Sequence, residues 1–396
     1  MSARILVAAD IRFPLERANG VQVIKSAAAL ARRGAATTLL VRQSDPRTTP
    51  EILALYGLAP HEHLEVRRLP VLHRRGSYHL PRVSFLFRAS AAALRAFSQG
   101  GIVFTRDLQL ADLLLALPGK GARTVVYEAH AVEAVMYGER GDLYGTGEAP
   151  DPGKRRRIEE RERRVWQRSS AVVTTTRGIK ESLEGAYGAR AKVAVVPNGC
   201  DLPKDRGFAG LPPEPRVLYA GQLYPWKGVD VLVRAIAQVP EARLMILGGI
   251  EGEADLSRIR ALVDSLGLGS RVEMAGTVPQ ARVAAEMARA RVVAIPFLHS
   301  AMTERHTSPL KAFEAMASGR AIVASDLPSS REIFEDGVDA LLVPPQDEAA
   351  LGTALRRLLV EDDLARRLAQ AAWTKAPRYS WDSRAESLLR LFEEAV

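Results

Sequence analysis

The 396 residues are enough for two or three domains, and 47% of them are hydrophobic, while one cysteine, Cys200, excludes a disulfide framework or cysteine-rich zinc site. The net charge of +9 is concentrated in residues 1–200, which hold 31 Lys and Arg against 19 Asp and Glu and so predict contact with anions. Zinc-finger spacing, RNP-like motifs and basic-region heptads are absent, which argues against nucleic acid as a partner.

The first residues indicate where the protein is found. Met1-Ser2-Ala3-Arg4 leads at once into the strand-like Ile5–Ala9, without the ordered regions of a signal peptide. No apolar run approaches the roughly 20 residues that a membrane span requires. With the single cysteine, these features predict a cytoplasmic protein.

Both halves of the sequence alternate short β-branched runs with longer helical patterns. Continuous apolar runs of this kind predict parallel strands that helices cover on both faces. Two consecutive sets predict an α/β protein with two doubly wound domains. We expect strands near Ile5–Ala9, Thr38–Val41, Ile102–Thr105, Thr124–Tyr127, Ala171–Thr175 and Val193–Val196, and then near Arg216–Tyr219, Leu244–Leu247, Val272–Ala275, Val292–Ile295, Ala321–Ala324 and Ala340–Val343.

A cluster of prolines and glycines in Pro197–Pro215 marks the break between the domains. We therefore expect an N-terminal domain over residues 1–198 and a C-terminal domain over residues 199–379. A last helix is expected at about Asp382–Glu394.

A glycine-flanked loop in the second half carries a lysine. The loop reads Gly221-Gln222-Leu223-Tyr224-Pro225-Trp226-Lys227-Gly228 and follows the strand Arg216–Tyr219. Open parallel sheets bind ligands after their strands, and a lysine there can reach a diphosphate as a point charge. The alternative is a solvated loop lysine. Glycines after two further strands, in Leu247-Gly248-Gly249 and Gly276-Thr277-Val278-Pro279, suit loops that approach a nucleotide closely.

A second segment, Thr307 to Gly319, predicts a helix that begins with a Ser308 cap and Pro309. Because this helix follows the strand Val292–Ile295, its dipole and free N–H groups favour phosphate at its start.

Glu314, one turn into this helix, can hold ribose hydroxyls. The alternative is an ordinary capped surface helix with a Lys311–Glu314 ion pair.

These two segments resemble the donor-site signatures of the retaining glycosyltransferases of family 4, which have the GT-B fold. Neither half has Gly-x-Gly-x-x-Gly after its first strand or a P-loop motif, which argues against a dinucleotide dehydrogenase and a P-loop NTPase. The resemblance extends over nearly the whole chain and includes Val196-Pro197-Asn198-Gly199-Cys200-Asp201 and the last helix.

The resemblance implies a retaining enzyme that moves a sugar from a UDP- or GDP-sugar to an acceptor hydroxyl, in the synthesis of a cell-surface polysaccharide or glycolipid. It implies that no metal or other cofactor is needed. It also implies that the last helix, about residues 380–396, packs back on the N-terminal domain. The positions that match donor contacts are Gly20, Gln222, Lys227, Gly248, His306, Thr307, Ser308, Pro309, Leu310, Lys311 and Glu314.

Two of these positions depart from the usual family pattern. Glu314 matches the second glutamate of a Glu-x7-Glu motif, which holds the ribose, but His306 stands where the first is usual. Members that read Ser-Pro-x-Lys-x-Phe-Glu at this helix commonly lack that first glutamate, and Glu304 or His306 could contact the sugar instead. Gln222 stands where an arginine is usual, so Lys227 must supply more of the charge, with Lys311.

In the N-terminal half, the resemblance places Gly20 against the donor diphosphate and His130 near the transferred sugar. A glycine at a helix start and a structural histidine are the alternatives. We expect His130 and Lys227 to serve catalysis. The family mechanism is a front-face displacement in which the leaving diphosphate helps to deprotonate the acceptor, so that positioning and electrostatics dominate.

Two basic stretches have no place in this donor site. The stretch Arg67-Arg68-Leu69-Pro70-Val71-Leu72-His73-Arg74-Arg75 precedes Val83-Ser84-Phe85-Leu86-Phe87-Arg88, and this mixture of cations and aromatics suits an anionic membrane surface. We therefore expect a saccharide or lipid-linked acceptor. Lys154-Arg155-Arg156-Arg157 predicts a solvated helix face.

Two rival functions stay open. A nucleotide-sugar 2-epimerase of the same fold would release a changed sugar nucleotide without any acceptor. A catalytically silent nucleotide-sugar-binding protein would bind nucleotide without turnover. Gln222 and His306 leave that alternative open, because they stand where the family usually has an arginine and a glutamate.

Overall fold

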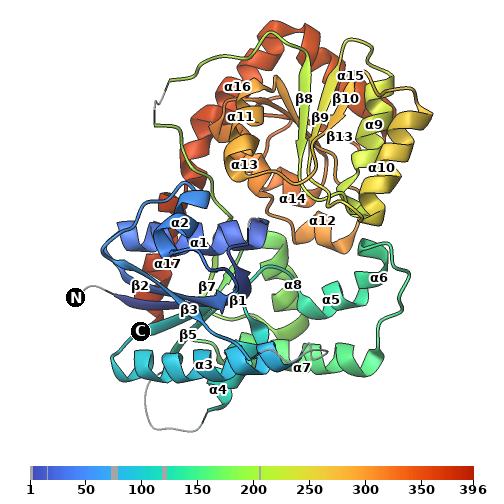
Figure 1. Ribbon diagram of the computed structural model, residues 1–396. Helices are drawn as coiled ribbons and strands as arrows, with labels where there is room; N and C mark the ends of the chain where they lie inside the picture. The colour runs from blue at the N-terminus through green and yellow to red at the C-terminus, as the bar shows by residue number, and fades with distance from the viewer. Residues whose placement is uncertain (1–2, 16, 73–78, 118–122, 205–206) are drawn as a thin grey trace. The chain divides into compact units, whose positions relative to one another are not determined.

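The computed structural model describes residues 3–15, 17–72, 79–117, 123–204 and 207–396 (Figure 1). Its contacts divide the chain into two compact units. Unit 1 comprises Met1–Tyr137, Asp151–Asn198 and Trp381–Val396, and unit 2 comprises Gly138–Pro150 and Gly199–Ser380. The short segment Gly138–Pro150 therefore belongs by its contacts to the second unit, which its position in the sequence does not suggest.

Unit 1 is built on a seven-stranded parallel sheet in the order β3-β2-β1-β4-β5-β6-β7. The central strands are apolar on both faces and buried, because helices cover both sides. The strands are β1 (Arg4–Phe13), β2 (Ala36–Gln43), β3 (Leu64–Leu69), β4 (Ile102–Thr105), β5 (Thr124–Ala129), β6 (Ala171–Thr174) and β7 (Val193–Val195).

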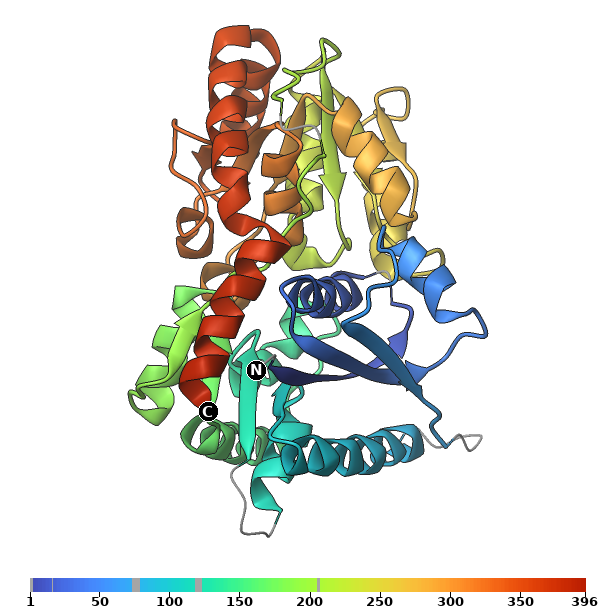
Figure 2. The ribbon, with the colours of Figure 1, turned by 90° about the vertical axis from the view of Figure 1, so that its left-hand side faces the viewer.

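The helices of unit 1 form two layers. On one side α1 (Ala18–Arg32) packs against α17 (Trp381–Ala395), which also contacts β5 and β6. On the other side α3 (His79–Ser98), α4 (Leu108–Ala116) and α7 (Pro152–Arg168) follow one another (Figure 1). The last helix thus completes the unit that the first residues begin, as Figure 2 shows for the red ribbon. The remaining helices are α2 (Thr49–Leu55), α5 (Glu133–Gly138) and α8 (Arg177–Tyr187).

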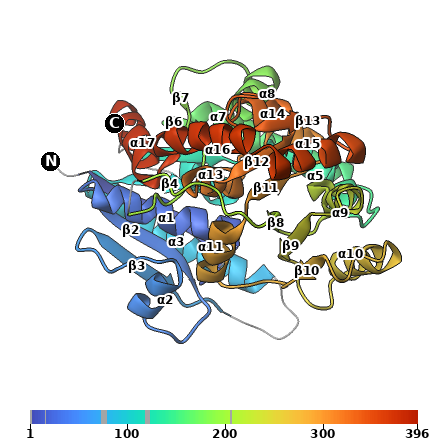
Figure 3. The same ribbon diagram turned by 90° about the horizontal axis from the view of Figure 1, so that it is seen from above.

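Unit 2 is built on a six-stranded parallel sheet in the order β10-β9-β8-β11-β12-β13, part of which can be followed in Figure 3. All six strands were predicted. They are β8 (Arg216–Ala220), β9 (Arg243–Leu247), β10 (Val272–Met274), β11 (Val292–Ile295), β12 (Ala321–Ser325) and β13 (Leu341–Val343).

The helices of unit 2 bury a large aliphatic cluster against this sheet, mainly through α9, α10, α15 and α16. The elements are α6 (Arg140–Leu143), the 3-10 turn η1 (Pro225–Lys227), α9 (Val229–Ala237), α10 (Ala254–Ser265), α11 (Gln280–Arg289), α12 (Ala301–Arg305), α13 (Leu310–Ala317), α14 (Pro328–Arg331), α15 (Glu348–Val360), α16 (Asp362–Lys375) and η2 (Ala376–Tyr379). Among the described residues, no helix of either unit combines the length and the hydropathy of a membrane span.

Three local predictions were wrong. The stretch around Arg67 and Arg68 begins as strand β3, which the sequence reading missed because an edge strand carries charged side chains. After the first strand the sequence also predicts a long loop from Asp10 to Asn19, but β1 runs to Phe13 and α1 begins at Ala18. Ser308 does not occupy the N-cap position of α13: Pro309 does, and it makes no side-chain cap hydrogen bond.

Candidate active site

The loops after β8, β9 and β10 interlock at the carboxyl edge of the unit 2 sheet. The amide of Gly221 donates to the carbonyl of Leu247 at 2.8 Å, and the amide of Gly248 donates to that of Gly276 at 2.7 Å. A Cβ on Gly248, whose φ is +134°, would lie 1.7 Å from the carbonyl oxygen of Gly221. Only glycine permits this approach of the two loops. Open parallel sheets bind ligands at this carboxyl edge.

Lys227 ends the 3-10 turn that follows β8, and two aromatic rings surround its ammonium group. Nζ lies 3.8 Å from the ring centroid of Trp226 and 4.5 Å from that of Phe297. The amide of Leu298 donates to the carbonyl of Trp226 at 3.0 Å, which ties this turn to the loop after β11. The lysine is thereby held at the ends of two neighbouring strands, β8 and β11.

No ion pair to Lys227 occurs within the described ranges, so its charge is unmatched by a carboxylate. Removal from water lowers the pKa of Lys227 to about 7. Burial disfavours the charged ammonium, and the two rings compensate in part through cation–π attraction. An anion that binds beside Lys227 therefore stabilises the charged form of its ammonium group strongly.

Gly228 allows the lysine turn to sit so close to the neighbouring strand. Its φ is +67°, and a Cβ there would lie 1.8 Å from the carbonyl oxygen of Pro296. The predicted pattern of glycine after lysine thus has a steric cause in this fold.

The segment Gly138–Pro150 also reaches the lysine turn. The ring of Tyr144 meets that of Tyr224 edge to face at 5.0 Å, and Gly145 would bring a Cβ within 3.3 Å of Pro225. Sequence reasoning missed this contact, because nothing near Tyr144 in the chain indicates a distant partner.

His306 and Glu304, the two candidates for a sugar contact, differ in their surroundings. The side chain of His306 is buried, and its Nδ1 atom has no hydrogen-bond partner. Burial, with help from Arg305, lowers the pKa of His306 to about 4, so the ring is neutral at pH 7. Glu304 is half-buried instead, and its Oε1 atom lies 3.0 Å from Nδ1 of His299.

The predicted Gln222 resembles His306 in one respect, since its buried Oε1 atom also lacks a partner. Buried polar atoms are nearly always hydrogen-bonded, so such orphans mark places where a ligand or water completes the network. In contrast, Thr307 uses its hydroxyl internally, donating to the carbonyl of Met302 at 2.9 Å.

Glu314 faces two partners from within unit 2. Nζ of Lys311 lies 2.6 Å from Oε2, and Nε2 of Gln280, at the start of α11, donates to Oε1 at 3.3 Å. The ion pair of the alternative interpretation is therefore present. Leu310, one of the predicted donor contacts, is buried in the first turn of the same helix.

Gly20, predicted as a donor contact in unit 1, lies in the first turn of α1. A Cβ there would lie 1.9 Å from the carbonyl oxygen of Leu15. This close approach accounts for the glycine without any ligand.

His130 lies just past β5, beside a buried carboxylate that the sequence analysis did not single out. Its Nε2 atom is 3.4 Å from Oε2 of Glu128, and Nε2 of Gln22 donates to both oxygens of Glu128 at 3.1 Å. Burial first, and then Arg106, lower the pKa of His130 to about 4, which leaves a neutral imidazole.

Arg384 of the last helix completes this cluster from 256 residues away. It pairs with Glu128 and also donates to the carbonyls of Val196 and Pro197 at 2.6 and 2.7 Å. Burial alone would raise the pKa of Glu128, but Arg384 and His130 outweigh it and hold that pKa below its usual range. The cluster joins β5, the last helix and the end of the second segment of unit 1, Asp151–Asn198.

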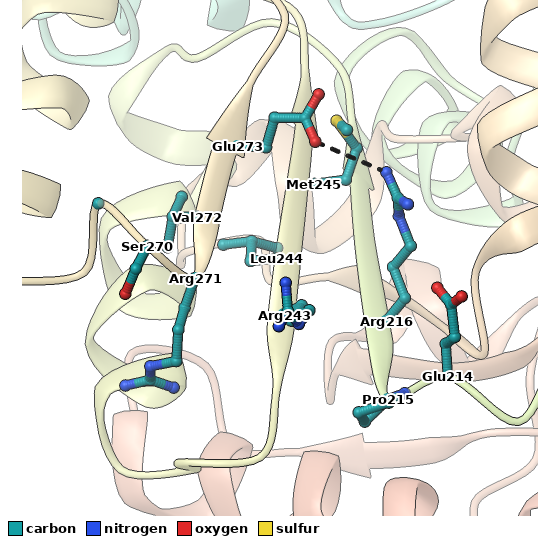
Figure 4. Close-up of a pocket in the computed structure, with 11 residues that line it drawn as sticks. Glu214, Pro215, Arg216, Arg243, Leu244, Met245, Ser270, Arg271, Val272 and Glu273 are labelled. Carbon is teal, nitrogen blue, oxygen red and sulfur yellow. Dashed lines mark ion pairs between the residues drawn. The ribbon is translucent and has the colours of Figure 1, made fainter.

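A hollow of about 450 Å³ opens at the opposite edge of the unit 2 sheet (Figure 4). The side chains of Arg216, Arg243 and Arg271 line it, and Arg216 faces Glu273 at 3.9 Å. Because β8, β9 and β10 begin there, the hollow lies away from the lysine turn and belongs to no predicted site.

Several cations of the predicted membrane stretch have partners inside unit 1. Arg67 pairs with Glu65, and Arg68 donates to the carbonyls of Asp45 and Arg47. Arg82, just before the second part of the stretch, pairs with Asp10 and Asp107. These arginines stabilise the unit. Three further residues of the stretch, His73, Arg74 and Arg75, lie outside the described residues.

Comparison with known proteins assigns both halves of the chain. Residues 20–199 match the family described as "Glycosyl transferase 4-like domain", and residues 214–361 match "Glycosyl transferases group 1". A "D-inositol 3-phosphate glycosyltransferase" of Xylanimonas cellulosilytica is 34% identical over 268 residues. The match covers 63% of this chain and 62% of that relative, less than two thirds of its length.

Solved structures share the fold. A sucrose-phosphate synthase from Thermosynechococcus elongatus has a TM-score of 0.74 at 22% identity, covering 99% of this chain and 98% of its own. Anabaena HepE, solved in complex with UDP and glucose, has a TM-score of 0.71 at 18% identity, covering 98% and 99%. These likenesses confirm the predicted GT-B fold of two Rossmann-like domains.

Proposed function

Since both halves of the chain are glycosyltransferase domains, we propose that the protein moves a sugar from a nucleotide-diphospho-sugar to an acceptor hydroxyl, with retention at the anomeric carbon. The observation that carries the proposal is Lys227, a cation without an acidic partner at the end of β8, among the described residues. A diphosphate supplies the missing charge, and its departure is eased by a fixed cation.

The other groups of unit 2 fit the rest of a nucleotide. Gly248 and Gly276 carry no side chains, so a base or ribose can approach the backbone of the loops after β9 and β10 closely. Glu314 takes the ribose hydroxyls and shares its charge with Lys311. The orphan atoms of Gln222 and His306 supply neutral hydrogen bonds in place of the usual arginine and glutamate.

His130 serves in positioning on this proposal. A neutral imidazole can accept from or donate to a sugar hydroxyl, and its buried Nε2 atom, 3.4 Å from Glu128, has no hydrogen-bond partner among the described residues. We propose that the leaving diphosphate itself takes the proton of the acceptor hydroxyl. We propose UDP- or GDP-sugars as donors, and the UDP found in HepE makes UDP-sugars the first choice.

The acceptor is proposed to be a saccharide, a lipid-linked saccharide or a phosphorylated polyol, the last because of the relative named for D-inositol 3-phosphate. We further propose that turnover needs no metal, because Lys227, Lys311 and the helix start neutralise the phosphates. Turnover that is unchanged by EDTA supports this part, and loss that Mg²⁺ or Mn²⁺ restores overturns it.

The test begins with a thermal-shift panel of UDP-, GDP- and ADP-sugars. The best donor is then incubated with an acceptor panel, with nucleoside diphosphate release as the readout and the anomeric configuration of the product read by NMR. Release that depends on an acceptor supports the proposal. Release of a changed sugar nucleotide indicates an epimerase, and binding without any release indicates a silent binding protein, which Gln222 and His306 would then explain.

Glu314→Ala separates ribose recognition from general nucleotide affinity. We expect the variant to bind UDP about 10- to 100-fold more weakly, as for loss of hydrogen bonds to a charged group. Binding of 2′,3′-dideoxy-UDP should be affected much less. Equal losses for both nucleotides would remove Glu314 from the ribose site.

A further inference from the structure

The outer face of α3 exposes an apolar stripe. Val83 is 60% exposed, Phe87 76% and Leu94 44%, whereas Phe85, Leu86, Ala89 and Ala93 are buried on the inner side. At 3.6 residues per turn the three exposed side chains fall within about 40° of arc and extend over about 16 Å. Single exposed hydrophobic residues are common on protein surfaces, but an aligned stripe with an exposed phenylalanine indicates a contact.

Leu72 enlarges this stripe. Its amide donates to the hydroxyl of Ser84 at 3.2 Å, which holds the preceding loop beside the first turns of α3, and its side chain is 59% exposed. We call Leu72, Val83, Phe87, Leu94 and the two arginines described next the α3 outer face.

Arg88 and Arg95 flank the stripe along one side, seven residues apart. Both are exposed, and neither forms an ion pair with any residue that the structure describes, whereas Arg82 is neutralised by Asp10 and Asp107. The sequence of α3 contains no acidic residue. The face therefore combines exposed apolar groups with unmatched positive charge.

We propose that the α3 outer face lies on an anionic lipid surface, with the stripe in the acyl boundary and the two arginines at the headgroups. Helices with an apolar face and basic flanks bind in the interface plane of membranes, through apolar burial and attraction to anionic lipid. Residues 1–200 hold 31 basic and 19 acidic residues. This surplus of positive charge adds attraction to anionic lipid over a longer range. This inference goes beyond the proposed glycosyl transfer and does not depend on it.

Charge argues against a second copy of the chain as the occupant. A two-fold symmetric dimer would place the same patch of both copies together, and Arg88 and Arg95 would then face their own counterparts without any acid on α3. An anionic bilayer instead offers acyl chains to the apolar stripe and negative headgroups to the two arginines. α4 lies beside α3 in the same layer (Figure 1), and its Leu113 is 38% exposed.

The test is sedimentation of the full-length protein with vesicles of phosphatidylcholine, with and without phosphatidylglycerol, at low and at physiological salt. We expect binding only to the anionic vesicles, weaker at the higher salt. Phe87→Ser/Leu94→Ser should reduce binding at least tenfold. Arg88→Gln/Arg95→Gln should reduce it about fivefold per arginine and weaken its salt dependence.

Val360→Ser is the matched control, because Val360 is also 60% exposed but ends α15 in unit 2. It should bind as the wild type does, and circular dichroism checks that every variant folds. Failure to sediment at low salt overturns the inference, as does binding that Phe87→Ser/Leu94→Ser leaves unchanged or equal binding to neutral vesicles. A wild-type dimer that this double variant converts to a monomer also overturns it, by assigning the face to a second copy.

Discussion

At the scale of single residues, the proposed chemistry depends on groups whose surroundings make them respond strongly to a ligand. Lys227 lies between two aromatic rings, and His306 and Gln222 each bury a polar atom without a partner. Lys227 was predicted to follow the correct strand, but the sequence could not reveal the rings of Trp226 and Phe297 as a pair, because they are 71 positions apart in the chain.

The lowered pKa of Lys227 predicts a pH dependence of donor affinity. A bound diphosphate requires the charged ammonium, whose pKa is about 7 in the empty site and higher in the complex. The affinity for a UDP-sugar should therefore be constant below pH 7 and fall by up to about tenfold per pH unit above it. Calorimetry at pH 6 to 9, in two buffers with different ionisation enthalpies, measures both the affinity and the proton uptake.

Lys227→Arg is the control for this effect, because a guanidinium stays charged across that range. The arginine variant should bind with a pH-independent affinity and without proton uptake at position 227. A wild-type affinity that is flat from pH 6 to 9 would show that the lysine is already charged in the empty site.

At the scale of elements, much of the fold followed from the apolar patterns. All six strands of unit 2 and six of the seven in unit 1 were predicted, because buried parallel strands read as continuous apolar runs. β3 was missed since its edge position lets it carry Glu65, Arg67 and Arg68. The predicted Ser308 cap of α13 was wrong, because Pro309 has extended backbone torsions and itself stands at the N-cap.

Gly228 gives a prediction for the element that carries the lysine. Gly228→Ala must displace the turn from the carbonyl of Pro296, in addition to straining a φ of +67°. We expect thermal-shift binding of the nucleotide to be lost. Gly267→Ala has nearly the same φ, +65°, but nothing within 4 Å of the added Cβ, so it should cost only about 1 kcal/mol and keep binding. Equal behaviour of the two variants would contradict the steric argument.

The last helix gives a second prediction at this scale. Arg384 and Glu128 are 3% and 2% exposed, so Arg384→Met leaves a buried carboxylate without its main partner. We expect a loss of about 3 to 5 kcal/mol in the unfolding free energy, measured by urea denaturation. Arg32→Met removes an exposed pair with Asp382 between the same two helices, α1 and α17, and should cost less than about 1 kcal/mol. Comparable losses of unfolding free energy in the two variants would show that the buried pair stabilises the unit no more than the exposed pair does.

At the scale of the whole molecule, the fold was easier to predict than the sites. Two sets of parallel strands and a proline-rich break suffice to predict two Rossmann-like domains, and comparison with solved structures confirms the GT-B fold. Contacts between distant segments were not predictable from local pattern. Arg384 reaches Glu128 across 256 positions, and Tyr144 joins the unit that begins again only at Gly199.

The central claim is that Lys227 holds the diphosphate of a sugar nucleotide. Calorimetric titration of the wild type and of Lys227→Met with the nucleoside diphosphate that gives the largest thermal shift tests it most directly. Methionine keeps the apolar stem and the packing against Trp226 but removes the charge. The account predicts binding weakened by about 10- to 100-fold, as for loss of a charged hydrogen bond. Equal affinity of the two proteins would contradict it.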